Sequence, residues 1–228
     1  MTLDLHDPHP FDVTPAEAVA IQRRLEARVV EAPLDASAVR TVGGLDVSVR
    51  EDRVRAAVVV LDAETLQVVD EAIWEGPVAF PYVPGLLSFR EIPALLPALE
   101  QLAALPDVLV LDAHGRAHPR RFGLACHLGV LLGRPAIGVA KSLYVGRFAD
   151  LGEEKGATAD LVHRGETVGV ALRTRARVLP VFVSVGHRCR LADAVALTLR
   201  TTGRFKIPEP TRLAHRLSYD GALGRDGG

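Results

Sequence analysis

The sequence predicts an α/β protein in which helices cover both faces of one mixed five-stranded sheet. Residues 108–111 are four consecutive apolar side chains, which is typical of a strand buried on both faces. A second apolar run at 135–140 follows a segment of helical spacing, so these two strands are expected to be parallel neighbours. Before them, three strand-like segments with short connections indicate an antiparallel meander.

The bulk composition is that of an ordinary globular protein. With 228 residues, 48% of them hydrophobic and 24% charged, the chain suits a single domain over residues 1–228, with loose termini at 1–13 and 221–228. Its apolar runs are shorter than the roughly 18 residues that span a bilayer, and its two cysteines make no disulfide framework. Because its start lacks the basic and apolar regions of a signal peptide, we expect a cytoplasmic protein without membrane contact. We also expect a monomer.

The charge is nearly balanced in sum but not in distribution. A formal net charge of −1 gives no support for nucleic-acid binding by itself. Basic and imidazole side chains nevertheless gather after the first buried strand, at His114, Arg116, His118, Arg120 and Arg121. Such a group is either a solvated face or a surface that holds phosphates without reading the base sequence.

The first elements follow from caps and alternation. A helix is expected to begin at Thr14, because Thr14, Pro15 and Glu17 together form a capping box with proline in the first turn. The meander follows as strands at 41–50, 54–61 and 66–74. In the first of these strands, apolar side chains occupy one face and Asp46 lies on the polar face.

The later elements are separated by proline- and glycine-containing connections. Three prolines keep residues 76–85 out of regular structure. A helix with four leucines between positions 95 and 102 comes next, before the buried strand at 108–111. Beyond residue 141, a polar stretch reaches to residue 165. After it we expect strands at 167–172 and 179–185, a helix through 191–199 and a short helix starting near 208.

Two charged residues end the two buried strands. Asp112 follows one and Lys141 follows the other, and ligands of open α/β sheets bind beyond such carboxyl ends. If the strand that contains Asp46 lies next to the strand that ends at Asp112, the two carboxylates face each other at this edge of the sheet. Converging carboxylates hold hard divalent ions such as Mg²⁺. The alternatives are a helix cap for Asp112 and an ordinary surface position for Lys141.

Other candidate residues have strong local alternatives. Ser88 and Glu91 form a capping-box pattern, and on local signal alone that interpretation of Glu91 is favoured. His215 is by default a half-buried helix residue. Tyr82 stands between Pro81 and Pro84, where the backbone is restricted on both sides. A stiff exposed aromatic can fill the space left by a displaced base, although Tyr82 could also pack under its own loop.

Four motifs together resemble one family. They are Pro-Tyr-Val-Pro-Gly-Leu-Leu-Ser-Phe-Arg-Glu at 81–91, Asp-Ala-His-Gly-Arg-Ala-His-Pro at 112–119, Gly-Val-Ala-Lys at 138–141 and Pro-Thr-Arg-Leu-Ala-His at 210–215. Residues 14–218 are similar in this way to endonuclease V, the deoxyinosine 3′ endonuclease. The resemblance implies a ribonuclease H-like fold, which agrees with the strand order derived above.

The resemblance also implies roles for the charged residues. Asp46 and Asp112 match the metal-binding aspartates of the family, and Glu91 matches its third acidic residue. Lys141 corresponds to a catalytic lysine and His215 to an active-site histidine. The implied cofactor is Mg²⁺, with Mn²⁺ as a substitute.

The substrate-binding residues are implied in the same way. The wedge that separates strands at the lesion corresponds to Pro81, Tyr82, Val83 and Pro84. Residues matching those that surround the extruded hypoxanthine through their backbone are Gly85, Leu87, Gly115 and Leu124, and His118 is counted with this substrate-binding set. The chain departs from the expected pattern at Ala113, where glycine would be expected.

The implied activity is hydrolysis of the second phosphodiester bond 3′ to deoxyinosine in DNA, which leaves 3′-hydroxyl and 5′-phosphate ends and initiates DNA repair. One alternative is an endoribonuclease that acts mainly on inosine-containing RNA. Another is a catalytically silent nucleic-acid-binding module of the same fold. An enzyme of small phosphorylated molecules would fit the neutral net charge but would leave Tyr82 without a purpose.

Overall fold

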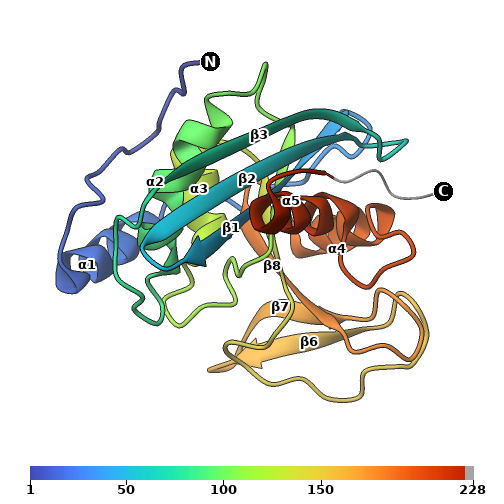
Figure 1. Cartoon of the computed structure of the whole chain (residues 1–228). Coiled ribbons are helices and arrows are strands. Elements are labelled where there is room, and N and C mark those ends of the chain that lie inside the picture. Colours follow the sequence, from blue (N-terminus) through green and yellow to red (C-terminus); the bar gives the residue numbers. More distant parts are fainter. Residues whose placement is uncertain (224–228) are drawn as a thin grey trace.

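The computed structural model describes residues 1–223, and within them one mixed sheet of eight strands carries five helices (Figure 1). The strands are β1 (Thr41–Arg50), β2 (Arg53–Asp62), β3 (Val68–Pro77), β4 (Val108–Leu111), β5 (Ala136–Ala140), β6 (Thr158–His163), β7 (Glu166–Leu172) and β8 (Val181–His187). The helices are α1 (Pro15–Glu26), α2 (Leu87–Leu99), α3 (Leu124–Leu132), α4 (Leu191–Arg200) and α5 (Glu209–Asp220). The spatial order of the strands is β3-β2-β1-β4-β5-β8-β7-β6.

The first five strands pair as the sequence predicts. β1, β2 and β3 form the antiparallel meander, and β4 lies parallel to both β1 and β5. The helix between β4 and β5 is α3, so these elements form the expected β-α-β unit. The carboxyl ends of β4 and β5 therefore meet at one edge of the sheet.

The expectation of a five-stranded sheet is wrong, because the sheet continues beyond β5. β8 pairs antiparallel with β5, and β7 and β6 follow it. The sequence indicates β7 and β8 as strands but not their place in this sheet. β6 lies in the polar stretch that was expected to be irregular. As the last strand it buries only alternate side chains, Ala159 and Leu161, so its apolar signal is weak.

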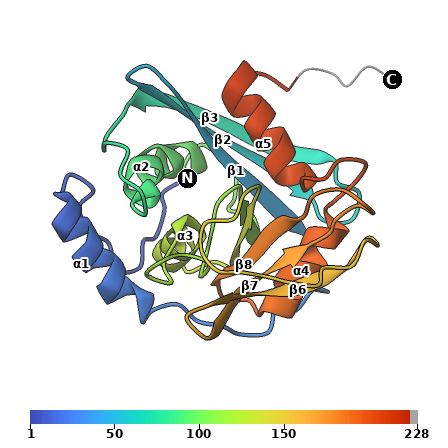
Figure 2. The same ribbon diagram turned by 90° about the horizontal axis from the view of Figure 1, so that it is seen from below.

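Helices cover both faces of the sheet, as predicted. Figure 2 shows α2 and α3 on one side of the sheet and α5 on the other. The alternation within β4 reflects these two layers. Leu109 and Leu111 pack in the apolar cluster with α2 and α3, whereas Val108 and Val110 pack in the cluster with α4. A residue of β4 thus faces one helical layer and its neighbour the other.

The N-terminal segment is not loose. Residues 1–13, all of them described, lie outside helices and strands, yet Leu3, Leu5 and Phe11 pack against the main apolar cluster. The backbone N–H of His6 also donates to the Leu131 carbonyl at 2.7 Å. At the other end, residues 224–228 of the expected loose terminus lie outside the described residues. None of the helices within residues 1–223 combines the length and apolar character needed to cross a membrane.

Candidate active site

Asp46 and Asp112 lie side by side on two neighbouring strands, Asp46 in the middle of β1 and Asp112 directly after β4. β1 and β4 are parallel with Leu45 opposite Leu111, so the next residue on each strand is an aspartate. Because Leu45 and Leu111 face α2 and α3, both carboxylates face the layer of α5. Their side chains are only 13% and 11% exposed. α3 begins at Leu124 after the N-cap Gly123, so the helix-cap interpretation of Asp112 is wrong.

α5 brings a histidine to the same place. Nδ1 of His215 lies 3.2 Å from Oδ2 of Asp46, and the hydroxyl of Ser218 donates to that same carboxylate oxygen. One potential ligand atom from each of Asp46, Asp112 and His215 lies within 4.8 Å of the other two. Two carboxylate oxygens and an imidazole nitrogen at this spacing form a donor set that could hold one divalent cation.

A glycine in β1 allows α5 to come this close. A Cβ atom on Gly44 would lie 1.9 Å from the backbone oxygen of Pro210, at the start of α5. Since backbone atoms cannot move aside cheaply, any side chain at this position would displace the helix. Gly44 therefore sets the approach that places His215 against Asp46.

Glu91 adds a third carboxylate from the opposite layer. α2 begins at Leu87 with Leu86 as its N-cap, so the capping-box interpretation of Glu91 is wrong. Burial raises the pKa of Glu91 to about 8, and the nearby carboxylates of Asp46 and Asp112 add to the effect. Without a cation, burial and repulsion between the carboxylates therefore favour the protonated form of Glu91, and a bound cation would relieve this repulsion.

Lys141 neutralises part of this charge. It follows β5, and its ammonium group forms an ion pair with Asp112. Burial raises the pKa of Asp112, and the hydrogen bond and positive charge of Lys141 oppose that rise. The Lys141 side chain is 42% exposed, so it borders both the carboxylates and the solvent.

A cavity of about 390 Å³ opens next to Asp112 and Lys141. Seven of the predicted substrate-binding residues line it, namely Tyr82, Val83, Pro84, Gly85, Leu87, His118 and Leu124. Gly115 instead packs against β8, where its N–H donates to Ser184 Oγ at 2.9 Å. Pro81 is likewise outside the set of described residues that line the cavity. Ala113, which stands where glycine was expected, is part of the wall.

The loop that carries Tyr82 is fastened at Gly85, whose φ of +82° suits glycine. The Gly85 carbonyl accepts hydrogen bonds from Gln22 Nε2 at 3.0 Å, His118 Nε2 at 3.1 Å and Arg120 Nη2 at 2.6 Å. Burial lowers the pKa of His118 to about 3, so the ring is neutral. Its Nδ1 accepts from the Arg120 backbone N–H at 3.2 Å, and its proton therefore lies on Nε2.

Tyr82 itself projects from this fastened loop. Its side chain is 70% exposed, so the alternative of a tyrosine packed under its own loop is wrong. The Arg90 guanidinium lies 5.9 Å from the centre of the ring. A loop held by hydrogen bonds and an exposed aromatic ring on it are the properties expected of a side chain that inserts between bases.

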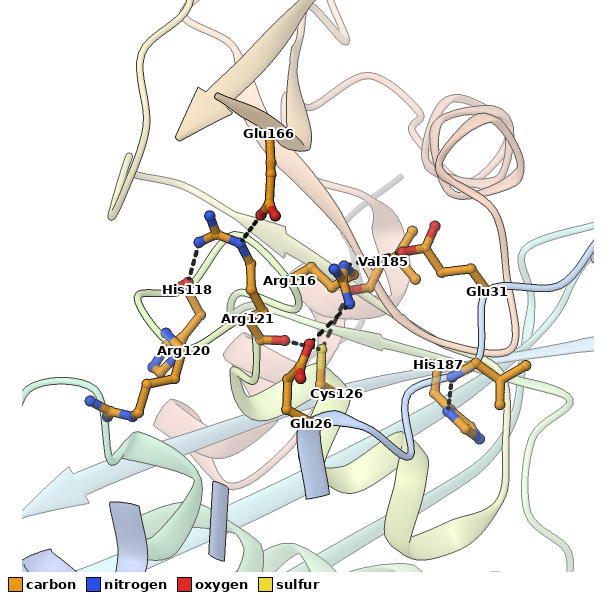
Figure 3. Close-up of polar contacts among 11 residues, drawn as sticks. Glu26, Glu31, Arg116, His118, Arg120, Arg121, Cys126, Glu166, Val185 and His187 are labelled. Atoms are coloured by element: carbon orange, nitrogen blue, oxygen red, sulfur yellow. Dashed lines mark hydrogen bonds and ion pairs between the residues drawn. The ribbon is translucent and has the colours of Figure 1, made fainter. Parts of the chain in front are cut away.

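Two arginines of the basic group after β4, Arg116 and Arg121, form ion pairs (Figure 3). Arg116 pairs with Glu26 and Glu31 at 3.6 and 3.1 Å, and Arg121 pairs with Glu166 at 2.8 Å. These contacts join α1 and the turn between β6 and β7 to the loop after β4. The hypothesis that this group serves mainly to hold phosphates is therefore not favoured for Arg116 and Arg121.

Several cavity residues escaped the sequence-based prediction, among them Gln22, Ser88 and Tyr144. Ser88 lies within the motif at 81–91, but the sequence indicates it there only as part of a capping-box pattern. A signal for Gln22 was present, since it is buried with Ala18 and Leu25 on the inner face of α1. A polar residue within an apolar stripe needs a buried partner, and here the partner is Gly85.

The chain closely resembles known proteins over its whole length. A family model described as Endonuclease V matches residues 23–216. The "Endonuclease V" of Nocardia farcinica is 51% identical over 224 residues, which cover 97% of this chain and 98% of that protein. The "Endonuclease V" of Trichormus variabilis is 46% identical over 218 residues, covering 95% and 99%.

Solved structures agree with this similarity. The crystal structure of the Endonuclease V from Streptomyces avermitilis superposes with a TM-score of 0.90 at 49% identity, covering 94% of this chain and 95% of the other. Endonuclease V from Ciona intestinalis, in complex with a 24mer DNA containing an inosine followed by a ribo-adenosine, gives a TM-score of 0.80 at 29% identity, covering 90% and 96%. The resemblance drawn from the four motifs is thereby confirmed, and the chain belongs to the endonuclease V family of phosphodiester-cleaving hydrolases.

Proposed function

We propose that this protein is a Mg²⁺-dependent endonuclease that recognises deoxyinosine in DNA and hydrolyses the second phosphodiester bond 3′ to it, initiating repair. One observation carries the proposal: a cluster of two aspartates and a histidine reaches a cavity of about 390 Å³ through Asp112, and an exposed tyrosine on a fastened loop also lines that cavity. The cavity is within the range of small-molecule sites, so one nucleobase would fit. The Ciona relative, crystallised with inosine-containing DNA, supports the choice of substrate.

The donor set fits a divalent cation. Asp46 and Asp112 would hold Mg²⁺ by their carboxylate oxygens, with His215 beside them and Mn²⁺ as a substitute. When bound, the cation supplies Lewis-acid stabilisation to the scissile phosphate and the leaving 3′ oxygen. Ser218 holds the Asp46 carboxylate in place, since its hydroxyl donates to the oxygen that also faces His215.

The remaining charged residues act on the phosphate and on water. The Lys141 ammonium, already paired with Asp112, lies where it would stabilise the extra negative charge of the pentavalent transition state. Glu91 or His215 would orient the attacking water and accept its proton. Hydrolysis in this way leaves 3′-hydroxyl and 5′-phosphate ends.

The lesion would be read outside the helix. Tyr82 would fill the gap while the extruded base enters the cavity, at a cost of a few kcal/mol that is lowest for a poorly paired base. Gly85, Leu87 and Leu124 line the cavity, and their main-chain groups would meet the O6 side of hypoxanthine. Adenine differs from hypoxanthine on this side.

A strand-cleavage assay tests the proposal. A duplex with one inosine is expected to be nicked with Mg²⁺ but not with EDTA, and a matched undamaged duplex is expected to stay intact. Asp112→Asn is expected to lower the nicking rate by roughly a hundredfold or more while lesion binding stays measurable. The exposed-carboxylate variant Glu64→Gln serves as the control. Equal nicking of both duplexes, or a fully active Asp112→Asn variant, would contradict the proposal.

A ribonucleotide substrate is the second candidate. The DNA bound to the Ciona relative carries a ribo-adenosine directly after the inosine, so a ribose at that position is compatible with that family member. Rates on matched RNA and DNA strands, each with one inosine, distinguish the two candidates. Faster cleavage of the RNA would make this chain an inosine-specific endoribonuclease.

A further inference from the structure

A buried chain of three polar side chains runs from the N-terminal segment to the cavity. Nε2 of His9 lies 2.7 Å from Nε2 of His127 in α3, and Nδ1 of His127 lies 2.9 Å from Oγ of Ser88 in α2. His127 is fully buried, and Ser88 is 1% exposed and lines the cavity. The aromatic rings of Phe11 and Phe89 pack against the two imidazoles. These three hydrogen-bonded side chains are therefore shielded from water except at His9 and Ser88, the two ends of the row.

The protons in this chain have one consistent arrangement. Nδ1 of His9 lies 2.9 Å from the Pro10 carbonyl oxygen, which can only accept, so Nδ1 carries a proton. Burial lowers the pKa of both His9 and His127, so each ring is neutral and holds a single proton. His9 Nε2 is then an acceptor and receives Nε2–H of His127. It follows that His127 Nδ1 accepts the hydroxyl proton of Ser88.

This arrangement fixes the hydrogen-bonding role of Ser88, which is one of the residues that line the cavity. Its single hydroxyl proton is directed at His127, so the oxygen can only accept a further hydrogen bond. Gln22 and His118, which also line the cavity, donate their N–H groups to the Gly85 carbonyl. Ser88 thus differs from these two neighbours, because it presents an acceptor.

We propose that Ser88 Oγ is a specificity-determining acceptor that selects bases with an N–H on their Watson–Crick edge, and that His9 and His127 fix its orientation. The inference rests on the proposed function, in which a flipped base enters this cavity. Hypoxanthine carries N1–H and can donate to Ser88. The N1 atom of adenine is an acceptor, so adenine would bring two lone pairs together in a buried place. A site that leaves buried polar groups unpaired rejects the wrong ligand strongly.

The test measures binding of single-stranded oligonucleotides that carry one inosine, one adenosine or one nebularine, in EDTA so that no strand is cut. Nebularine is a purine nucleoside with hydrogen at C6 and an acceptor at N1. The wild-type protein is expected to bind the inosine strand most tightly. Ser88→Ala is expected to weaken inosine binding by roughly tenfold and to strengthen nebularine binding, because the repulsion between the serine oxygen and N1 is removed.

His9→Phe tests the direction of the hydrogen bonds among His9, His127 and Ser88, while it keeps an aromatic ring at position 9. Without the His9 acceptor, His127 is expected to carry its proton on Nδ1 and donate it to Ser88, which turns the serine proton toward the cavity. The binding ratio is then expected to move from inosine toward nebularine. Phe11→Leu, which alters the packing around His9 and keeps the hydrogen bonds, is the matched control and is expected to keep the wild-type ratio.

The outcomes separate this inference from the proposed function. Equal losses for inosine and nebularine in Ser88→Ala, or an unchanged ratio in His9→Phe, would overturn the role of Ser88. Both results are ratios within one protein sample, so partial unfolding affects numerator and denominator alike. A wild-type protein that binds inosine and adenosine strands equally would overturn the proposed function itself, whatever the variants do.

Discussion

At the scale of single residues, the site is dominated by three carboxylates that share a small, partly buried volume. Asp46 and Asp112 come from parallel neighbouring strands, and Glu91 faces them from the other layer. In the metal-free protein this concentration of charge is unfavourable, and it leaves a measurable trace in the pH dependence of stability.

The raised pKa of Glu91 predicts that the metal-free protein loses stability as the pH rises. Between the ordinary carboxyl pKa and about 8, the folded state holds a proton that the unfolded state has released. The free energy of unfolding therefore falls across this window and levels off above pH 8. Thermal unfolding in EDTA between pH 5 and 9 checks this, with Glu91→Gln expected to show a flatter profile. Parallel profiles for the two proteins would contradict the assignment.

The exposed ring of Tyr82 predicts a selective loss on truncation. Stacking of an aromatic ring on bases contributes about 1–3 kcal/mol, and this contribution arises only where the base stack is opened. Tyr82→Ala is therefore expected to weaken binding of an inosine duplex by about tenfold or more, and binding of an undamaged duplex much less. Tyr82→Phe keeps the ring and is expected to behave like the wild type. Equal losses of affinity for both duplexes would rule out the role of Tyr82 as a wedge.

The sequence predicts these residues to different degrees. Asp46 and Asp112 can be predicted from strand patterns alone. Asp46 is a polar residue within one apolar strand, and Asp112 directly follows another, and both features can be recognised in the sequence. Local patterns misassign Glu91, because a serine three residues before a glutamate has the same form whether or not a helix begins there. Ser88 depends on a contact with a distant segment, and such a contact has no local signature. Gln22 did have a local signal, since it is a polar residue within the apolar stripe of α1.

At the scale of elements, the site depends on how closely α5 lies on β1. The short distance between His215 and Asp46 exists because Gly44 has no side chain under Pro210. The helix is also held through the hydroxyl of Ser48, which donates to the Ser218 carbonyl at 2.7 Å. The geometry of the donor set is therefore fixed by the packing of two elements.

Gly44→Ala is expected to damage both stability and activity. The added Cβ would lie 1.9 Å from the Pro210 carbonyl oxygen, and overpacking of this kind costs about 1–3 kcal/mol. Displacement of α5 also withdraws His215 from Asp46, so the nicking rate is expected to fall along with the melting temperature. Gly203→Ala is the control, because its nearest neighbour is the flexible side chain of Glu209 at 3.3 Å. If the two variants behaved alike, the packing argument would be wrong.

The elements themselves were predictable where their pattern is local. Apolar runs identify β4 and β5 and their parallel pairing. The chain position of β7 and β8 could be predicted, but their attachment to the edge at β5 could not, because antiparallel pairing of distant strands leaves no periodic signal. The β6 strand has one exposed face and few apolar residues, so it resembles a polar loop.

At the scale of the whole molecule, the N-terminal segment closes one side of the structure. It runs beside α2 and α3, on the face of the sheet opposite α5 (Figures 1 and 2). Leu3, Leu5 and Phe11 pack on the main apolar cluster, and His9 reaches the buried His127. The sequence predicted a loose segment because it lacks periodicity, yet docking requires only a few apolar side chains at suitable positions.

Removal of residues 2–12 is therefore expected to destabilise the protein. Three partly buried apolar side chains contribute about 1 kcal/mol each, so the melting temperature is expected to fall by roughly 5–10 °C. A double variant with serine in place of the exposed Asp4 and Pro8 keeps the packed side chains and is expected to melt like the wild type. Thermal unfolding followed by circular dichroism distinguishes the two. An unchanged melting temperature after truncation would mean that the segment contributes nothing to the core, and the docking of His9 on His127 would then lose its structural support.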